Sequence, residues 1–287
     1  MILGGRTLKV YLINLDRSQV RQARMSALLE AAGVAFVRVR AVDGQLLSQA
    51  DIDSVYVPRP ADVPLTKGEV GCFLSHRACF ERIAADIDPY AVILEDDMHL
   101  SQDFAAICAD SGWIPAGADL VKLETSYKYG SLVEIDRHGV PVGDSRRCHR
   151  LHGWVSGTGA YVVSRDAASK LLDMTAKFET PIDVLIYDPL IGSARHFKIQ
   201  QVVPAPCIQD SGANWPTTPG IESILASERK ASAGDREVKR QRSLAGKVWR
   251  ELKRPFERLL ISPHIRIREF FRLVVEKRRK IIIEFRR

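Results

Sequence analysis

An apolar run that leads directly into three acidic residues is the feature that most constrains this chain. Residues 90–94 read YAVIL, and Glu95, Asp96 and Asp97 follow them. A short unbroken apolar run is typical of a parallel strand that is covered on both faces, and ligands of such sheets bind outside the carboxyl ends of the strands. The sequence therefore predicts a buried strand that carries carboxylates to a binding site.

Three adjacent carboxylates repel one another, so they stay together most easily around a hard divalent cation or when they point apart into water. If the strand continues through them, Glu95 and Asp97 project to one side, and Asp96 projects to the other side or toward backbone donors. Such a pair can hold Mn²⁺ or Mg²⁺ and leave positions open for diphosphate oxygens. A solvated acidic turn is the alternative interpretation.

Length and composition allow a large core and exclude some classes of protein. A chain of 287 residues with 46% hydrophobic residues can form one large domain with an appendage, or two small domains. The five cysteines are scattered without C-x-x-C spacing, which favours a reducing compartment over a disulfide framework or a zinc site. Because a charge comes early and no apolar run is long enough for a bilayer, we expect neither export nor membrane spanning.

The net charge of +7 conceals an acidic body and a basic tail. From residue 229 onward there are 20 Lys or Arg and 7 Asp or Glu, which leaves 22 basic and 28 acidic residues before that point. A polar stretch rich in small residues separates the two parts and is typical of a linker. We therefore expect a catalytic domain over 1–222, a linker over 223–243 and a basic tail over 244–287.

Apolar residues recur in the tail at helical spacing among many Lys and Arg. Pro255 and Pro263 interrupt the pattern, so a pair of basic amphipathic helices is predicted. Such helices lie in the interface of anionic membranes, where each basic residue near the surface contributes about 1 kcal/mol. Packing onto the body and self-association as a homo-oligomer are the alternatives. Nucleic-acid binding is disfavoured, because the tail has no aromatic platform or reading helix.

The first part of the chain predicts a strand–helix–strand unit over 8–15, 18–33 and 35–39. Asp16, Arg17, Arg21 and Arg24 lie in or just after its first turn, which faces the ligand crevice of a doubly wound sheet. Basic side chains near a helix start can bind phosphate, although solvated helix residues are the plainer interpretation of each one singly. The absence of a glycine-rich loop here disfavours P-loop enzymes and dinucleotide dehydrogenases.

A second helix is predicted just before the acidic strand. Thr66 and Glu69 have the spacing of a capping box, and Gly68 and Gly71 permit close approach of the backbone to a ligand. His76 lies on the same helix, where a packed or solvated role is the default.

The second half of the body predicts more strands and helices. A strand is expected over 118–124, a hairpin over 132–142 with its turn at residues 138–139, and a glycine-rich approach over 152–159 to a strand that ends at 164. A helix should follow over 165–175. Trp154 lies in the glycine-rich approach, where it can stack on a sugar ring or belong to the core. Tyr127, Tyr129 and Trp215 lie in irregular segments.

Four blocks of this sequence resemble glycosyltransferase family 25, which includes bacterial lipooligosaccharide galactosyltransferases and collagen galactosyltransferases. The blocks are YLINLDR at 11–17, LTKGEVGCFLSH at 65–76, ILEDD at 93–97 and GAYVVS at 159–164. The resemblance covers roughly residues 8–212 and implies a GT-A-like α/β fold, with a Rossmann-type mixed sheet flanked by helices. It also implies a UDP-sugar donor, a divalent metal ion (Mn²⁺ or Mg²⁺), and inversion at the anomeric carbon.

The resemblance also implies roles for individual residues. Asp97 is then the principal metal ligand, and Glu95 and Asp96 assist it or hold the ribose. Asn14, Arg17 and the turn at Gly68 and Glu69 line the nucleotide site in the same way. Asp16 and Arg21 are added to the residues of the nucleotide site, because they lie in or just after the turn between the first predicted strand and its helix.

An inverting transfer needs a base on the side opposite the leaving group, because an acceptor hydroxyl is a poor nucleophile at neutral pH. The acids that hold the metal lie on the leaving-group side, which leaves Asp183, Asp188 and Asp210 as candidates. Asp183 is preferred because it follows the glycine-rich strand and its helix, near the expected acceptor side. Asp210 is alternatively a further metal ligand, a role for which His196 also competes.

The sequence thus predicts a transferase that moves a sugar from a UDP-sugar to a glycan or lipid-linked acceptor of lipopolysaccharide or another surface polysaccharide. Galactose is the preferred identity of that sugar. The transferase is expected in the cytoplasm, peripherally attached to the inner face of the cytoplasmic membrane through the basic tail. A metal-dependent phosphoryl or phosphodiester hydrolase is the leading alternative, since paired carboxylates also serve that chemistry. A non-catalytic membrane- or nucleic-acid-binding protein comes third.

Overall fold

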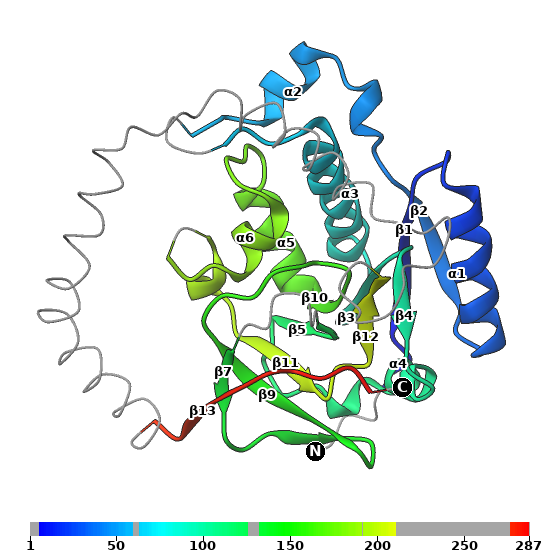
Figure 1. Cartoon of the computed structure of the whole chain (residues 1–287), viewed down its shortest axis with the longest axis vertical. Coiled ribbons are helices and arrows are strands. Elements are labelled where there is room, and N and C mark those ends of the chain that lie inside the picture. The colour runs from blue at the N-terminus through cyan, green and yellow to red at the C-terminus, as the bar shows by residue number, and fades with distance from the viewer. Residues whose placement is uncertain (1–5, 60–62, 126–131, 191, 211–275, 287) are drawn as a thin grey trace, which may run out of the picture.

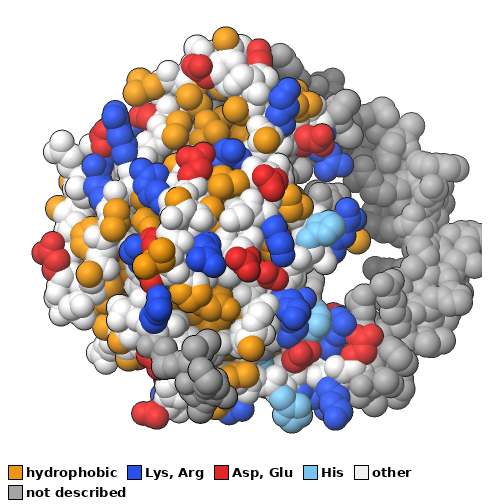
Figure 2. Space-filling model, turned by 180° about the vertical axis from the view of Figure 1, so that it is seen from behind, with side chains coloured by type: hydrophobic (Ala, Val, Ile, Leu, Met, Phe, Trp, Pro, Cys, Tyr) orange, Lys and Arg blue, Asp and Glu red, His pale blue; other side chains and the backbone are white. Residues whose placement is uncertain are grey.

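The computed structural model describes residues 6–59, 63–125, 132–190, 192–210 and 276–286 (Figure 1). Tyr127, Tyr129, Trp215, the predicted linker over 223–243 and the tail up to residue 275 lie outside the described residues, as does the predicted domain boundary. Among the described residues, no helix combines the length and the apolar character that crossing a bilayer requires. On the face seen in Figure 2, the described Lys and Arg side chains are interspersed with Asp, Glu and apolar side chains.

A ten-stranded mixed sheet organises the described part of the chain. In spatial order its strands are β13 (Arg278–Ile281), β7 (Val133–Asp136), β9 (Arg146–His152), β11 (Ile199–Val203), β5 (Leu120–Lys122), β10 (Ala160–Ser164), β3 (Tyr90–Glu95), β1 (Lys9–Asn14) and β2 (Phe36–Arg40), with β8 (Val140–Val142) paired to β9. A second sheet has the order β4 (Met98–Leu100), β12 (Cys207–Gln209) and β6 (Glu124–Thr125).

The directions of the strands bring several carboxyl ends to one edge of the large sheet. Strands β2, β1 and β3 are parallel to one another. Strand β10 is antiparallel to both β3 and β5, so β5 runs in the same direction as β3, and β11 is parallel to β5. The ends of β1, β3, β5 and β11 therefore open to the same edge, which is where ligands of such sheets bind.

Helices cover both faces of the sheet, as the α/β prediction requires. Strand residues such as Ile93 and Tyr161 form one core with α3 (Lys67–Ala84), α5 (Arg165–Met174) and α6 (Ile182–Tyr187). Strand residues such as Leu12 and Val92 form another with α1 (Gln19–Ala31) and α4 (Phe104–Ala109). Figure 1 shows α3 and α1 on either side of β1 and β2, with α2 (Gln49–Val55) farther out. The predicted mixed sheet flanked by helices is confirmed.

Local signals set several helix boundaries correctly. The capping box at the start of α3 is confirmed, because the Thr66 hydroxyl accepts from the Glu69 N–H at 3.2 Å and the Glu69 carboxylate accepts from the Thr66 N–H at 2.7 Å. Gly33 follows α1 with φ +68°, a conformation that favours glycine at a helix end. Ser18 precedes α1 but makes no side-chain cap hydrogen bond.

The predicted hairpin over 132–142 is wrong in the position of its turn. Strands β7 and β8 do not pair with each other, and both pair with β9, through Glu134 opposite His152 and Val140 opposite Cys148. The chain reverses at residues 143–145, where Gly143 supplies φ +56°. Gly139 instead permits close contact, because a Cβ there would lie 2.8 Å from the Cys148 carbonyl oxygen.

The last described residues are extended, so the predicted helical tail is wrong over 276–286. Strand β13 pairs antiparallel with β7, and the Ala205 N–H donates to the Glu284 carbonyl at 2.7 Å. Ile283 is 3% exposed whereas Ile282 is 51% exposed. This alternation has the period of a strand, and pairing with a sheet edge satisfies it better than a helix does.

Two glycines allow α3 to pack closely against the loop after β2. A Cβ at Gly71 would lie 2.6 Å from the Val42 carbonyl oxygen and 2.7 Å from the Gly44 nitrogen. Gly71→Ala should therefore lower the free energy of unfolding by about 1–3 kcal/mol, because backbone has to move to admit the methyl group. Thermal unfolding measures this. Glu30→Ala, at an exposed position of α1, is the control, and equal effects of the two substitutions would contradict this packing.

Candidate active site at the carboxyl edge of the sheet

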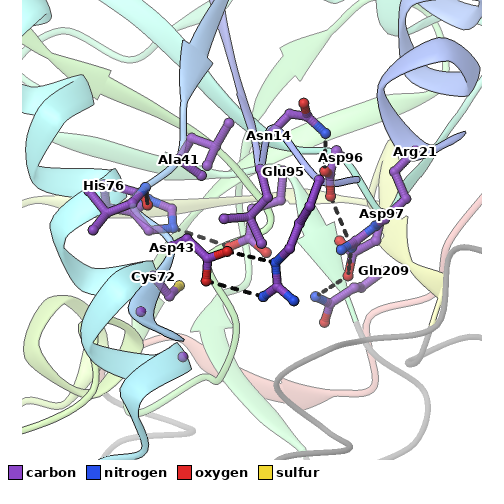
Figure 3. A pocket seen from close by; sticks show the side chains of 17 residues that line it. Asn14, Arg21, Ala41, Asp43, Cys72, His76, Glu95, Asp96, Asp97 and Gln209 are labelled. Atoms are coloured by element: carbon purple, nitrogen blue, oxygen red, sulfur yellow. Dashed lines mark hydrogen bonds and ion pairs between the residues drawn. The ribbon is translucent and has the colours of Figure 1, made fainter. Parts of the chain in front are cut away.

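A cavity lies at the carboxyl ends of β1 and β3. Its open space, including its mouth, is about 650 Å³, and residues of β1, α1, α3, the loop after β2 and the turn after β3 line it. Figure 3 shows Cys72 and His76 on the α3 wall, facing Asp96, Asp97 and Arg21 across the cavity. The cavity therefore lies at the edge of the sheet where ligands of such sheets bind.

Arg21 holds two of the three acids together. Strand β3 ends at Glu95, so the alternation expected for a continuing strand does not apply to Asp96 and Asp97. Both carboxylates instead reach the same Arg21 nitrogen, Nη2, which lies 2.9 Å from Asp96 Oδ1 and 3.0 Å from Asp97 Oδ2. Glu95 separates from this pair and turns toward α3. The structure thus groups Asp96 with Asp97, where the strand pattern grouped Glu95 with Asp97.

Two amides complete the surroundings of this acidic pair. The Asn14 Nδ2 group donates to Asp96 Oδ2 at 2.6 Å, and the Gln209 Nε2 group donates to Asp97 Oδ2 at 3.0 Å. The other oxygen of Asp97, Oδ1, is buried and has no hydrogen-bond partner among the residues that the structure describes. Such an unpartnered buried oxygen is costly and points to a missing ligand.

Burial raises the pKa of Asp97 to about 8, with the charges of Glu95 and Asp96 adding to the shift and Arg21 opposing it. Burial also raises the pKa of Asp96, against the opposing effects of Arg21 and Asn14. A bound cation would favour the ionised forms and would bond to the free Asp97 oxygen. Because the ligand atoms that this pair offers to an ion are carboxylate oxygens, the residues fit a hard divalent ion such as Mg²⁺ or Mn²⁺.

Glu95 belongs to a separate hydrogen-bonded group. Its Oε1 atom lies 3.1 Å from His76 Nε2 and 3.3 Å from the Thr158 hydroxyl, and His76 Nδ1 lies 3.0 Å from the Tyr161 hydroxyl. Burial is the largest effect and would raise the pKa of Glu95, but the hydrogen bonds with His76 and Thr158 and the electrostatic effects of His76 and Arg21 together hold that pKa below its usual value. From the sequence, only a packed or solvated role was predicted for His76, because its partners Glu95 and Tyr161 are distant in the chain.

The remaining residues predicted for the nucleotide site divide into two sets. Arg17 and Gly68 line the cavity, and Arg17 Nε lies 2.8 Å from Asp43 Oδ2, an acid that the sequence analysis did not select. Asp16 does not line the cavity and pairs with arginines of β2. The carboxylate of Glu69 caps α3 and is likewise not part of the lining.

The three candidate bases all lie outside the lining of this cavity. Asp183 Oδ2 accepts from the Gly157 N–H at 3.1 Å, and Asp188 Oδ1 accepts from the Leu190 N–H at 2.7 Å. Asp210 is buried, with its Oδ1 atom 2.8 Å from His99 Nε2, and its N–H donates to the Asp97 carbonyl at 3.0 Å. His196, the alternative metal ligand, is exposed beside Arg195.

Asp183 is connected to the acidic site through one loop. The loop 157–159 joins them, because its Gly157 N–H binds Asp183 and its Thr158 hydroxyl binds Glu95. The carbonyl of Gly159 in the same loop accepts from the Glu95 N–H at 2.7 Å. Asp183 therefore lies one short loop away from the end of β3.

One family model matches this chain, and several curated relatives are glycan-biosynthesis proteins. The model of glycosyltransferase family 25 (LPS biosynthesis protein) matches residues 7–186. The lipooligosaccharide biosynthesis protein lic2B of Haemophilus influenzae is 27% identical over 226 residues, which cover 73% of this chain and 80% of that protein. The lacto-N-neotetraose biosynthesis glycosyltransferase LgtE of Neisseria gonorrhoeae is 25% identical over 85% of this chain and 87% of its own length. Procollagen galactosyltransferase 1-B of Xenopus laevis is 36% identical over 68% of this chain, but over 34% of its own greater length.

Removing Arg21 should destabilise the protein, because two buried carboxylates would then face each other without a counter-charge. Arg21→Gln should lower the free energy of unfolding by about 3 kcal/mol, as for other broken buried ion pairs. Adding Mn²⁺ should raise the melting temperature of this variant by more than that of the unmodified protein. Differential scanning fluorimetry with and without the ion measures both effects.

Arg17→Gln is the matched control, because the Arg17 side chain is 47% exposed and an exposed ion pair contributes about 1 kcal/mol or less. Equal losses in the two variants would contradict the role of Arg21 as the shared counter-charge. No response of Arg21→Gln to Mn²⁺ would contradict a cation site at the acidic pair.

Proposed function

The chain belongs to glycosyltransferase family 25, as its sequence motifs predict, and we propose that it transfers galactose from a UDP-sugar to a glycan or lipid-linked acceptor. The proposed pathway is lipopolysaccharide or lipooligosaccharide biosynthesis. Relatives named for lipooligosaccharide biosynthesis and for procollagen galactosylation support these finer assignments. Membership in this family favours a transferase over a hydrolase or a non-catalytic binding protein.

The observation that carries the proposal is the buried Oδ1 atom of Asp97, which has no hydrogen-bond partner in the described part of the chain and lies beside an arginine-lined cavity. In this proposal the cavity holds the UDP part of the donor, near Asn14, Arg17 and Gly68. A Mg²⁺ or Mn²⁺ ion held by Asp97, with Asp96 and Glu95 beside it, would stabilise negative charge on the diphosphate as UDP leaves. Arg17 and Arg21 are the arginines of this lining, where guanidinium groups suit phosphate oxygens.

Asp183 is our proposed base. Two backbone donors hold its carboxylate, the Gly157 N–H at 3.1 Å from Oδ2 and the Val184 N–H at 2.9 Å from Oδ1. These two bonds orient the carboxylate, and the loop 157–159 separates it from Glu95 in the hydrogen-bonded chain. There it would take the proton from the acceptor hydroxyl as the new glycosidic bond forms. Asp210 remains our candidate for a further metal ligand beside Asp97, whose backbone carbonyl accepts from the Asp210 N–H.

The site of action is also proposed to be the inner face of the cytoplasmic membrane. From residue 229 onward the sequence has 20 Lys or Arg but only 7 Asp or Glu, and this positive charge supports attraction to an anionic lipid surface. A lipid-linked acceptor would be found at such a surface.

Substitution of Asp183 should separate catalysis from donor binding. Asp183→Asn keeps the size of the side chain but removes the base, so transfer from UDP-galactose should fall by a factor of about 10²–10⁴. The affinity for UDP in the presence of Mn²⁺ should stay unchanged. UDP release and the radiolabelled glycan product report turnover, and isothermal titration calorimetry reports UDP binding.

Asp173→Asn, at an exposed position of α5, is the matched control and should keep full activity. A larger loss in Asp188→Asn than in Asp183→Asn would assign the base to Asp188 instead. No release of UDP from any UDP-sugar, under any metal condition, would overturn the proposed function itself.

A further inference from the structure

A second cavity lies beside the loop 157–159. Its open space, including its mouth, is about 490 Å³, and its lining includes Glu124, Thr125, Trp154, Ser156, Gln201 and Ile283. The loop contacts the linings of both cavities, because the Thr158 hydroxyl binds Glu95 of the first and the Gly159 N–H donates to Glu124 Oε1 of the second at 2.8 Å.

Strand direction places the second cavity at the same edge of the sheet as the first. Lys122 ends β5 and lines the cavity, as do Glu124 and Thr125 just after it. Because β5 runs in the same direction as β3, these residues lie at the same edge as Asp97. Asp183 binds the Gly157 N–H of the loop between them. The proposed base is therefore held by the segment that contacts both cavities.

The charge of the two cavities differs. In the second, Lys122 Nζ lies 2.8 Å from Glu124 Oε1, 2.5 Å from the Gly157 carbonyl oxygen, and 4.7 Å from the centre of the Tyr187 ring. Glu124 and Lys122 thus neutralise each other in a buried ion pair, whereas the two arginines that line the first cavity are outnumbered by its four acids. A neutral floor with hydrogen-bonding groups suits an uncharged polar ligand better than a phosphate or a nucleotide.

Gln201, which lines this cavity, carries an unused acceptor. Its Nε2 group donates to the carbonyl oxygens of Lys122 and Glu124 at 3.3 Å and of Val202 at 3.0 Å. These three oxygens fix the orientation of the amide, since the reverse orientation would set its oxygen against them. The Oε1 atom is then buried without a hydrogen-bond partner among the described residues. A ligand hydroxyl would satisfy it.

Trp154 provides an apolar surface at the same cavity. Its side chain is 47% exposed, unlike the buried Gln201 and Glu124. An exposed aromatic ring beside hydrogen-bonding groups matches a sugar, which has an apolar ring face and polar hydroxyls. Ile283 of the C-terminal extended segment lines the cavity too, and its carbonyl oxygen accepts from the Thr125 hydroxyl at 2.6 Å. The C-terminal extended segment therefore forms part of the wall of this cavity.

We propose that the second cavity binds an uncharged sugar residue of the acceptor glycan, with Trp154 against the ring face and Gln201 Oε1 accepting from a hydroxyl. This inference rests on the proposed transferase function. It divides the substrates by chemistry, with the charged donor in the first cavity and the neutral part of the acceptor in the second. Trp154 and Gln201 then contribute to the choice of acceptor.

The test measures binding of methyl glycosides of galactose, glucose and N-acetylglucosamine by saturation-transfer NMR and titration of the full-length protein. At least one glycoside should bind at millimolar concentration, and Trp154→Ala should weaken that binding about tenfold or more, which corresponds to about 1.4 kcal/mol. Trp154→Phe, which keeps an aromatic ring, should restore part of the affinity. UDP binding with Mn²⁺ should be the same in all variants.

Leu190→Ala is the matched control, because Leu190 is 84% exposed and lines neither cavity. Equal binding of glycosides to Trp154→Ala and to the unmodified protein would overturn the inference, as would the absence of glycoside binding in a protein that binds UDP. Glycoside binding that depends on Trp154 in a protein that fails to bind UDP would instead uphold this cavity and contradict the proposed donor.

Discussion

The shared contact of Asp96 and Asp97 with Arg21 is the interaction on which the rest of the site depends. Two carboxylates that are 5% and 2% exposed share one guanidinium group, so their charges are only partly balanced. Burying a charge without a full partner is expensive, and the high pKa of Asp97 is the direct consequence. A further cation bound here would therefore stabilise the arrangement. Because Arg21 comes from α1 and the acids follow β3, the same contact also fixes the first helix over the sheet.

The loop 157–159 gives the site its second organising feature. Three carboxylates from separate parts of the chain bind it, namely those of Glu95, Glu124 and Asp183. A Cβ at Gly157 would lie 2.9 Å from Glu124, and φ at this glycine is +86°, so the close approach needs glycine there. The loop thus holds the proposed base and contacts a charged cavity and a neutral one. This arrangement matches a reaction in which a diphosphate leaves and an alcohol attacks.

Short-range patterns carried most of what the sequence predicted correctly. The strand that ends in acids, the capping box at Thr66 and the end of α1 near Gly33 depend on neighbouring residues, and all three are confirmed. The hairpin turn was misplaced because Gly139 and Gly143 are equally plausible turn residues in the sequence. Only the pairing of β9 with both β7 and β8 distinguishes them.

Contacts between distant residues account for what the sequence did not predict. His76 and Gln209 lie in the site through partners 19 and 112 residues away, Glu95 and Asp97 respectively. The C-terminal strand was predicted as a helix because a run of basic residues followed by three isoleucines fits either period over so short a segment. Its pairing with β7 makes this segment a strand, and that pairing joins residues more than 140 positions apart.

A crystal structure of the protein with UDP and Mn²⁺ would test the proposed donor site directly. We expect the metal ion to bind Asp97 Oδ1 and the diphosphate, and the nucleotide to lie between Asn14, Arg17 and Gly68. We also expect that Asp97→Asn crystals treated in the same way contain neither the ion nor the nucleotide at this site. A nucleotide bound elsewhere, or bound in this cavity without contact between the ion and Asp97, would contradict the central claim.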